Sequence, residues 1–298
     1  MPDANIVQLQ DRHAYLIICH NNFKILQMLL SAIDDDRNDI YIHVDKKTAN
    51  VPFEDIQCAV SRSFLTFIER SSVNWGGYSQ INAELALLSE ATKTPHAYYH
   101  LISGVDFPLK SQADIHQFFD DNAGKEYISF DQCKERMEEF KDRIRYYRWF
   151  QDKIGRNRGK CVAIMYKLEN VSLRIQRMMK VDRLKYCPYE IKKGAQWFSI
   201  THNLATYLLS QKNIKKYFGK SLCTDELVVQ TLAYASPYRD NIAGNNLRLI
   251  DWCRGKPYTF TSDDYSQLVE SDRLFARKFD ENVNLNIVEM LLEHVKTK

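Results

Sequence analysis

Two adjacent carboxylates, Asp225 and Glu226, stand at the start of the apolar helical pattern 224–235. Thr224 is expected to cap this helix, which places Glu226 in its first turn. The positive end of the helix dipole favours an ionised carboxylate, and an ionised carboxylate can accept a proton as a general base. Alternatively, both residues only decorate a helix N-terminus, as acidic residues commonly do. A single base without a second carboxylate nucleophile favours direct displacement, with inversion at the reacting carbon.

Two basic residues in the last third of the chain, Arg248 and Lys278, could stabilise a departing diphosphate. Arg binds phosphate through a bidentate fork and Lys as a point charge. Each is also typical of an ordinary surface or ion-paired residue. The strand ends 43–47 and 103–107 contain no Asp-x-Asp pair, and the Asp triplet 34–36 precedes a strand, at the wrong end of the sheet. No metal or other cofactor is therefore expected.

Short apolar runs alternate with amphipathic stretches along the first 131 residues. This alternation predicts an α/β fold with a mostly parallel sheet and helices on both faces. Ligands bind such sheets beyond the carboxyl ends of the strands, where His43, Asp45 and Asp106 are placed. The predicted strands are 15–20, 39–45, 64–69, 97–103, 126–131, 195–201 and 247–252, and the main predicted helices are 22–33, 79–92, 113–119, 224–235 and 283–296.

Two aromatic segments could line a ligand cleft. In Trp75-Gly76-Gly77 the glycines permit close backbone approach and the indole offers a stacking face. Gln196-Trp197 begins a predicted strand and is similar in character. For both segments a turn or strand anchored by buried aromatic side chains remains an equal alternative.

The net charge of +3 is unevenly distributed. Residues 134–185 contain 16 Lys/Arg and 7 Asp/Glu, a local charge of +9, so the rest of the chain carries about −6. Such a patch can attract phosphate, anionic lipid or an acidic polysaccharide. The seven cysteines are scattered, and neither a signal peptide nor an apolar run of membrane-spanning length is present. A soluble, cytoplasmic protein with reduced thiols is expected.

Seven segments, taken in chain order, resemble the core-2/I-branching family of glycosyltransferases, which includes β-1,6-N-acetylglucosaminyltransferases and peptide O-xylosyltransferases. The resemblance runs from about residue 15 to 280. The segments are IHVDKK (42–47), VNWGGYS (73–79), HLISGVDFPLK (100–110), GAQWFSIT (194–201), TDELVVQT (224–231), LRLIDW (247–252) and LFARKFD (274–280).

The resemblance implies a modified GT-A fold that acts on a UDP-sugar without a metal. It makes Glu226 the catalytic base. It makes Arg248 and Lys278 the cations at the diphosphate. The remaining implied site residues are His43, Asp45 and Asp106 for the donor and Trp75, Gly76, Gly77, Gln196, Trp197 and Asp225 for the donor–acceptor cleft.

The expected function is metal-independent, inverting transfer of GlcNAc or xylose from a UDP-sugar to a glycan hydroxyl, in surface polysaccharide or glycoconjugate biosynthesis. We expect a bacterial-type enzyme with a UDP-sugar-binding half (1–131), a basic helical insertion facing the acceptor or a membrane (132–190) and a catalytic half (191–298). The basic insertion fits an anionic or lipid-linked acceptor, or peripheral contact with the inner face of a membrane. No nucleic-acid partner is expected. The alternative is a non-catalytic nucleotide-sugar- or glycan-binding protein.

Overall fold

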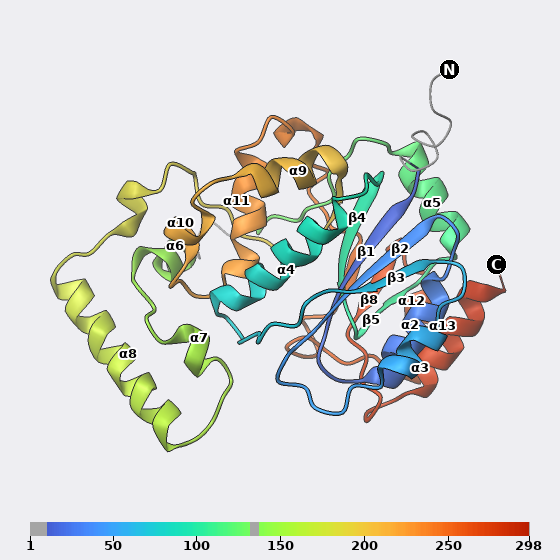
Figure 1. The fold of residues 1–298 in the computed structure, drawn as a ribbon, viewed down its shortest axis with the longest axis horizontal. Helices are drawn as coiled ribbons and strands as arrows, with labels where there is room; N and C mark the ends of the chain where they lie inside the picture. The colour runs from blue at the N-terminus through green and yellow to red at the C-terminus, as the bar shows by residue number, and fades with distance from the viewer. Residues whose placement is uncertain (1–10, 132–136, 298) are drawn as a thin grey trace.

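A five-stranded sheet lies at the centre of the computed structural model, which describes residues 11–131 and 137–297 (Figure 1). The strand order is β3-β2-β1-β4-β6. The first four strands are parallel, and β6 runs antiparallel beside β4. The strands are β1 (His13–Cys19), β2 (Asn38–Val44), β3 (Phe64–Phe67), β4 (Tyr98–Ser103) and β6 (Ser199–Thr201).

Helices cover both faces of this sheet, because each face of the central strands is apolar. In β1 the side chains of Tyr15 and Ile17 belong to one hydrophobic cluster and those of Ala14 and Leu16 to the other. The first cluster packs against α2 (Phe23–Ile33), α3 (Phe53–Cys58), α5 (Gln112–Asp121), α12 (Tyr265–Val269) and α13 (Asn286–Lys296). The second packs against α4 (Tyr78–Ala91), α9 (His202–Ser210), α10 (Ile214–Phe218) and α11 (Val228–Tyr234). The predicted α/β fold class, with a mostly parallel sheet flanked by helices, is confirmed.

A second, three-stranded sheet extends the fold beyond the carboxyl end of β4. Its strands are β5 (Asp106–Pro108), β8 (Phe275–Arg277) and β7 (Arg248–Ile250), in that order. β5 is antiparallel to β8, whereas β7 is parallel to it. Since β5 begins three residues after β4 ends, the small sheet continues from the edge at which ligands of parallel sheets bind.

The basic segment is helical, as expected, and comprises α6 (Met137–Arg145), α7 (Gln151–Ile154), α8 (Lys160–Met178) and the 3₁₀ turn η2 (Arg183–Tyr186). Figure 1 shows α8 lying well away from the five-stranded sheet. Both hydrophobic clusters combine residues from before 131 and after 190. The division into three functional segments stays a prediction.

Three predicted elements differ from the structure. The strand predicted at 126–131 forms isolated bridges only at Glu126 and Tyr127, and the strand predicted at 195–201 shortens to β6. The helix predicted at 224–235 splits into the 3₁₀ turn η3 (Thr224–Glu226) and α11. Thr224 as a helix cap was wrong, because the left-handed Cys223 holds that position. The two other 3₁₀ turns are η4 (Arg239–Asn241) and η5 (Ser262–Asp264).

A buried arginine joins the two sheets. The guanidinium of Arg248 donates to Oγ of Ser199 at 2.8 Å and to the carbonyl oxygens of Phe198 at 2.7 Å and Leu101 at 3.2 Å. It also donates to the carbonyl of Asn246. Burial lowers the pKa of Arg248 to about 9, so the group stays charged at neutral pH. The cation therefore binds backbone carbonyls of β4 and of the residues just before β6 and β7.

Replacing Arg248 by Met should lower the free energy of unfolding by about 3 kcal/mol, because the buried carbonyl groups lose their charged donor. Chemical denaturation measures this change. Arg62→Met, at an exposed site with ion pairs to Asp35 and Asp36, is the control and should leave stability nearly unchanged. Equal stability of the Arg248 variant and the wild type would contradict this structural role.

Candidate functional site

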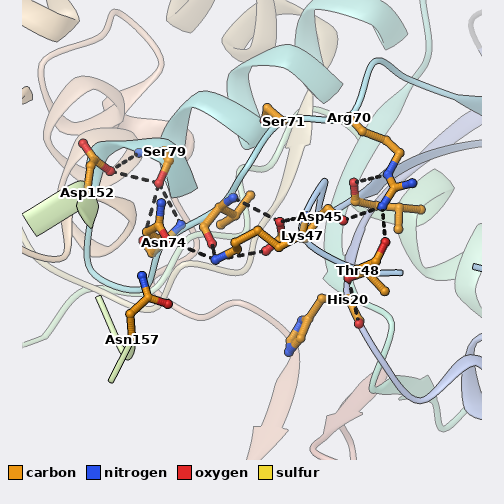
Figure 2. Close-up of polar contacts among 12 residues, drawn as sticks. His20, Asp45, Lys47, Thr48, Arg70, Ser71, Asn74, Ser79, Asp152 and Asn157 are labelled. Carbon is orange, nitrogen blue, oxygen red and sulfur yellow. Dashed lines mark hydrogen bonds and ion pairs between the residues drawn. The ribbon is translucent and has the colours of Figure 1, made fainter. Parts of the chain in front are cut away.

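The loop that follows β2 is built around the carboxylate of Asp45. Its Oδ1 accepts hydrogen bonds from the backbone N–H groups of Lys47 at 2.9 Å and Val73 at 3.4 Å. The Lys47 ammonium lies 3.5 Å from the same carboxylate and donates to Oδ1 of Asn74 at 3.0 Å. Figure 2 shows this network at the carboxyl edge of the sheet. The segment 73–74 is thereby held against the end of β2.

Arg70 and Thr48 together tie the loops after β1, β2 and β3 to one another. Its Nη2 donates to the carbonyl oxygens of Asp45 at 2.8 Å and Thr48 at 2.6 Å. The Thr48 hydroxyl in turn donates to the carbonyl of His20 at 3.0 Å (Figure 2). All of these bonds end on main-chain carbonyl oxygens. They therefore fix the backbone at this edge of the sheet, independently of the side chains that a ligand would contact.

His43, predicted to contact the donor, is enclosed in the protein. Its Nε2 accepts the backbone N–H of Ser71 at 3.1 Å and lies 2.9 Å from the Ser71 hydroxyl. Its Nδ1 is buried and has no hydrogen-bond partner in the described part of the chain. Burial lowers the pKa of His43, so the ring is neutral at pH 7. In this arrangement the imidazole positions the loop at Ser71 and presents no ring nitrogen to a ligand.

The loop Trp75-Gly76-Gly77 is shaped by its contact with α7. A side chain at Gly77 would place its Cβ 2.0 Å from Oδ1 of Asp152, and Gly76 has a left-handed φ of +70°. The same Oδ1 accepts the backbone N–H of Ser79 at 3.0 Å, at the start of α4 (Figure 2). The Trp75 ring is 47% exposed and carries the guanidinium of Arg156 at 4.8 Å. Gly76 therefore provides the left-handed turn, and Gly77 leaves the space that the Asp152 side chain of α7 occupies.

Two backbone hydrogen bonds gather the predicted cleft segments around Glu226. The N–H of Cys223 donates to the carbonyl of Gly76 at 2.8 Å, and the N–H of Gly194 donates to the carbonyl of Glu226 at 3.0 Å. The segments 75–77, 193–197 and 223–226 therefore meet, although they lie far apart in the sequence.

The Glu226 carboxylate stands between two cations. Nη1 of Arg143 donates to its Oε2 at 2.7 Å, and Nζ of Lys193 lies 3.6 Å from the same oxygen. The Glu226 side chain remains 35% exposed, so the carboxylate is reachable from solvent. The carboxylate is therefore held by two cations and open to a ligand on its exposed side. Sequence reasoning missed Arg143 and Lys193, which come from distant segments without a recognisable motif.

Two buried carboxyl groups lie behind Glu226. Nε2 of Gln80 donates to Oδ2 of Asp225 at 3.2 Å, and Nε2 of Gln196 donates to Oε1 of Glu84 at 2.7 Å. Burial, followed by the charge of Glu226, raises the pKa of Asp225 to about 7. Burial, followed by the charge of Asp225, holds the pKa of Glu84 well above its usual range. Glu84 was missed by sequence reasoning, although a Glu on the apolar face of a helix was a usable signal.

Asp106 and Trp197 form a buried stack below the edge. Asp106 accepts the Ser103 hydroxyl at 2.5 Å and the Ser103 N–H at 3.1 Å, and Nε of Arg277 lies 3.3 Å from its Oδ1. The Arg277 guanidinium also lies 4.1 Å from the centroid of the Trp197 ring. Asp106 is fully buried and Trp197 nearly so. Both residues therefore support the site from below in this structure.

Arg248 lies opposite Phe275 on the neighbouring strand, and Lys278 lies three residues after Phe275, just beyond the end of β8. The donors of Arg248 are also committed to protein carbonyls, so the prediction that Arg248 contacts a diphosphate is not supported by this arrangement. The backbone of Lys278 bonds to Tyr258 and Phe260, whereas its ammonium has no hydrogen bond or ion pair within residues 11–131 and 137–297.

Other features of the described residues complete the picture. No group of three or more His, Cys, Asp or Glu side chains there could hold a metal ion. Within the same ranges, no helix has the length and apolarity to cross a membrane. Two hollows of about 740 Å³ and 790 Å³ lie at the amino ends of the strands, beside Lys125 and Tyr98 respectively, and none of their lining residues is a predicted site residue.

The stability of the fold should depend on pH through Asp225. Because the native state holds this proton more tightly than the unfolded chain, stability should fall as pH rises from about 4 to about 7. Asp225→Asn should remove this slope, so the variant gains up to about 4 kcal/mol relative to the wild type across that range.

Denaturant titrations at pH 4, 5, 6 and 7 measure the slope, with the exposed Asp55→Asn as control. Parallel stability curves for wild type and Asp225→Asn would show that the carboxyl is not a buried acid.

Two xylosyltransferases are similar in sequence to this chain. Xylosyltransferase 2 of Rattus norvegicus is 23% identical over 312 residues, which cover 95% of this chain and 34% of that protein. Xylosyltransferase 1 of Homo sapiens is also 23% identical, over 94% of this chain and 30% of that protein. The chain thus spans about a third of the length of these relatives.

One solved structure, mouse xyloside xylosyltransferase 1 in its apo form, aligns over 89% of this chain and 96% of that one, with a TM-score of 0.39 and 10% identity. A family model described as Branch, Core-2/I-Branching enzyme, matches residues 13–272. Because this match covers most of the chain, the protein belongs to the Core-2/I-branching enzyme family.

Proposed function

We propose that the protein is a glycosyltransferase that moves a sugar from a UDP-sugar to a glycan hydroxyl, with inversion and without a bound metal. The observation that carries the proposal is the Glu226 carboxylate, partly exposed and paired with Arg143 and Lys193, in a chain of this family. Xylose and GlcNAc are the proposed sugars. The names of the relatives specify xylose for those proteins.

In the proposed reaction the acceptor hydroxyl gives its proton to Glu226. The acceptor oxygen forms a bond to the anomeric carbon as the bond from that carbon to the diphosphate oxygen breaks, and UDP leaves with the electron pair. Asp225 and Glu84 are buried, and their raised pKa values favour the protonated acid. Neither is therefore suited to be a second nucleophile, which supports single displacement.

We assign Lys278 the role of stabilising the departing diphosphate, because its ammonium is uncommitted within the described ranges. Arg248 is assigned to the junction of the sheets, where it supports the strand beside β8. The Asp45 loop would receive the uridine, since it lies beyond the carboxyl end of a central parallel strand.

We further propose that the acceptor belongs to a surface polysaccharide or glycoconjugate and that the protein works in the cytoplasm. The six cysteines among the described residues are free thiols, which fits a reducing compartment.

Glu226→Gln should reduce kcat by about 10²- to 10⁴-fold, because the amide cannot accept the acceptor proton. Binding of UDP should stay within about 3-fold, since the base acts on the acceptor side. Mass spectrometry of the product with a panel of UDP-sugars measures transfer, and calorimetry measures UDP binding. The exposed Glu54→Gln is the control. Full turnover by Glu226→Gln would reject the assignment, and no turnover by the wild type despite UDP binding would favour a binding protein.

Transfer should persist in excess EDTA at a rate within about 2-fold of the untreated enzyme, because side-chain cations would carry the leaving-group charge. Initial rates with and without chelator test this expectation. A loss of activity that Mn²⁺ or Mg²⁺ restores would overturn metal independence while leaving Glu226 as base.

A further inference from the structure

Helix α8 is attached to the body of the protein along one face. Glu169, Leu173 and Gln176 are the buried residues of that face. Oε2 of Glu169 accepts the backbone N–H of Phe150 at 3.1 Å, and the Gln176 amide bonds both the N–H and the carbonyl of Tyr147. These bonds fix which side of the helix faces outward.

The outward side carries an unpartnered apolar stripe, here called the α8 stripe. Its members follow one another at alternating spacings of four and three residues, which places them along one line of an α-helix about 21 Å long. Their exposed fractions range from 49% to 82%. The members of the stripe are Ile164, Leu168, Val171, Ile175 and Met178.

Positive charge accompanies the stripe. Lys160, Lys167 and Arg174 are exposed and lie along one flank of it, given 100° of rotation per residue. Glu169 is the acidic residue of α8, and it is buried on the opposite side. An apolar line with a basic flank and no exposed acid is the pattern of helices that lie in a membrane interface.

Charge selects the occupant of this surface. Two copies packed through the stripe would bring their basic flanks together, which disfavours a dimer. An anionic lipid surface receives the apolar side chains among its acyl chains and binds the basic flank at its headgroups. We propose that the α8 stripe binds the surface of a bilayer rich in anionic phospholipid.

This docking goes beyond the transfer reaction and requires no activity. It also has a defined geometric link to the candidate site. Next to α8, Nε2 of Gln151 in α7 donates to the carbonyl of Trp75 at 3.1 Å, and Trp75 precedes the Gly76 carbonyl that binds Cys223. A membrane held by α8 would therefore be fixed relative to the turn that carries Glu226.

Vesicle sedimentation tests the proposal with the full chain. Vesicles of phosphatidylcholine with 30% phosphatidylglycerol should retain the wild type, and pure phosphatidylcholine vesicles should bind it about 10-fold or more weakly. The variant Ile164→Gln/Leu168→Gln should lose about 10-fold or more in affinity for the anionic vesicles, because two apolar side chains no longer enter the interface. The matched control Phe64→Gln/Val283→Gln changes two equally exposed apolar residues elsewhere.

Charge is tested separately with Lys160→Gln/Lys167→Gln/Arg174→Gln, which should weaken binding to anionic vesicles by about 10-fold or more and reduce its salt dependence. The control Lys212→Gln/Lys215→Gln/Lys216→Gln removes three exposed lysines near α10 and should bind normally. Wild type that stays in the supernatant with anionic vesicles overturns the proposal. So does a dimer, seen by analytical ultracentrifugation, that the stripe variant dissociates without any change in vesicle binding. Neither result would bear on transfer by Glu226.

Discussion

A buried guanidinium costs free energy unless acceptors surround its donors, and both terminal nitrogens of Arg248 find acceptors at the junction of the two sheets. Among the described residues, its Nε has no hydrogen-bond partner. The acceptors are the Ser199 hydroxyl and the carbonyl oxygens of Leu101 in β4, of Phe198 just before β6 and of Asn246 just before β7. These bonds join the five-stranded sheet to the three-stranded sheet, which contains β8 and is followed by Lys278.

The candidate site combines one carboxylate that lies between two cations with two buried carboxyl groups. Glu226 stands between Arg143 and Lys193, whereas burial raises the pKa values of Asp225 and Glu84 behind it. The partly exposed Glu226 carboxylate is placed to exchange a proton with a ligand, and the buried pair is held by hydrogen bonds from Gln80 and Gln196.

Local patterns in the sequence predicted the strands that are long and apolar, and they placed Asp45 just beyond the carboxyl end of a strand, where the structure has it after β2. The pairing of Arg143 with Glu226 could not be predicted, because it depends on how a helix from a distant segment docks. The environment of Arg248 could not be predicted either, because a single Arg in a strand gives the same sequence pattern whether its side chain faces a ligand or backbone carbonyl groups. The prediction that Thr224 caps the helix was wrong because Cys223, in a left-handed conformation, occupies the N-cap position. No local sequence pattern indicates that conformation.

Gly77 has no Cβ atom, and the carboxylate of Asp152 occupies the place where a Cβ would lie. The first turn of α4 therefore packs directly against the helical segment formed by α7 and α8, and the contact occupies the space that a side chain at residue 77 would need. Among homologous sequences, the size of the residue at position 77 would indicate how closely the α7–α8 segment packs against α4. It would carry no information about the sugar that is bound. A residue larger than glycine at this position of an alignment would indicate an α7–α8 segment of different length or tilt.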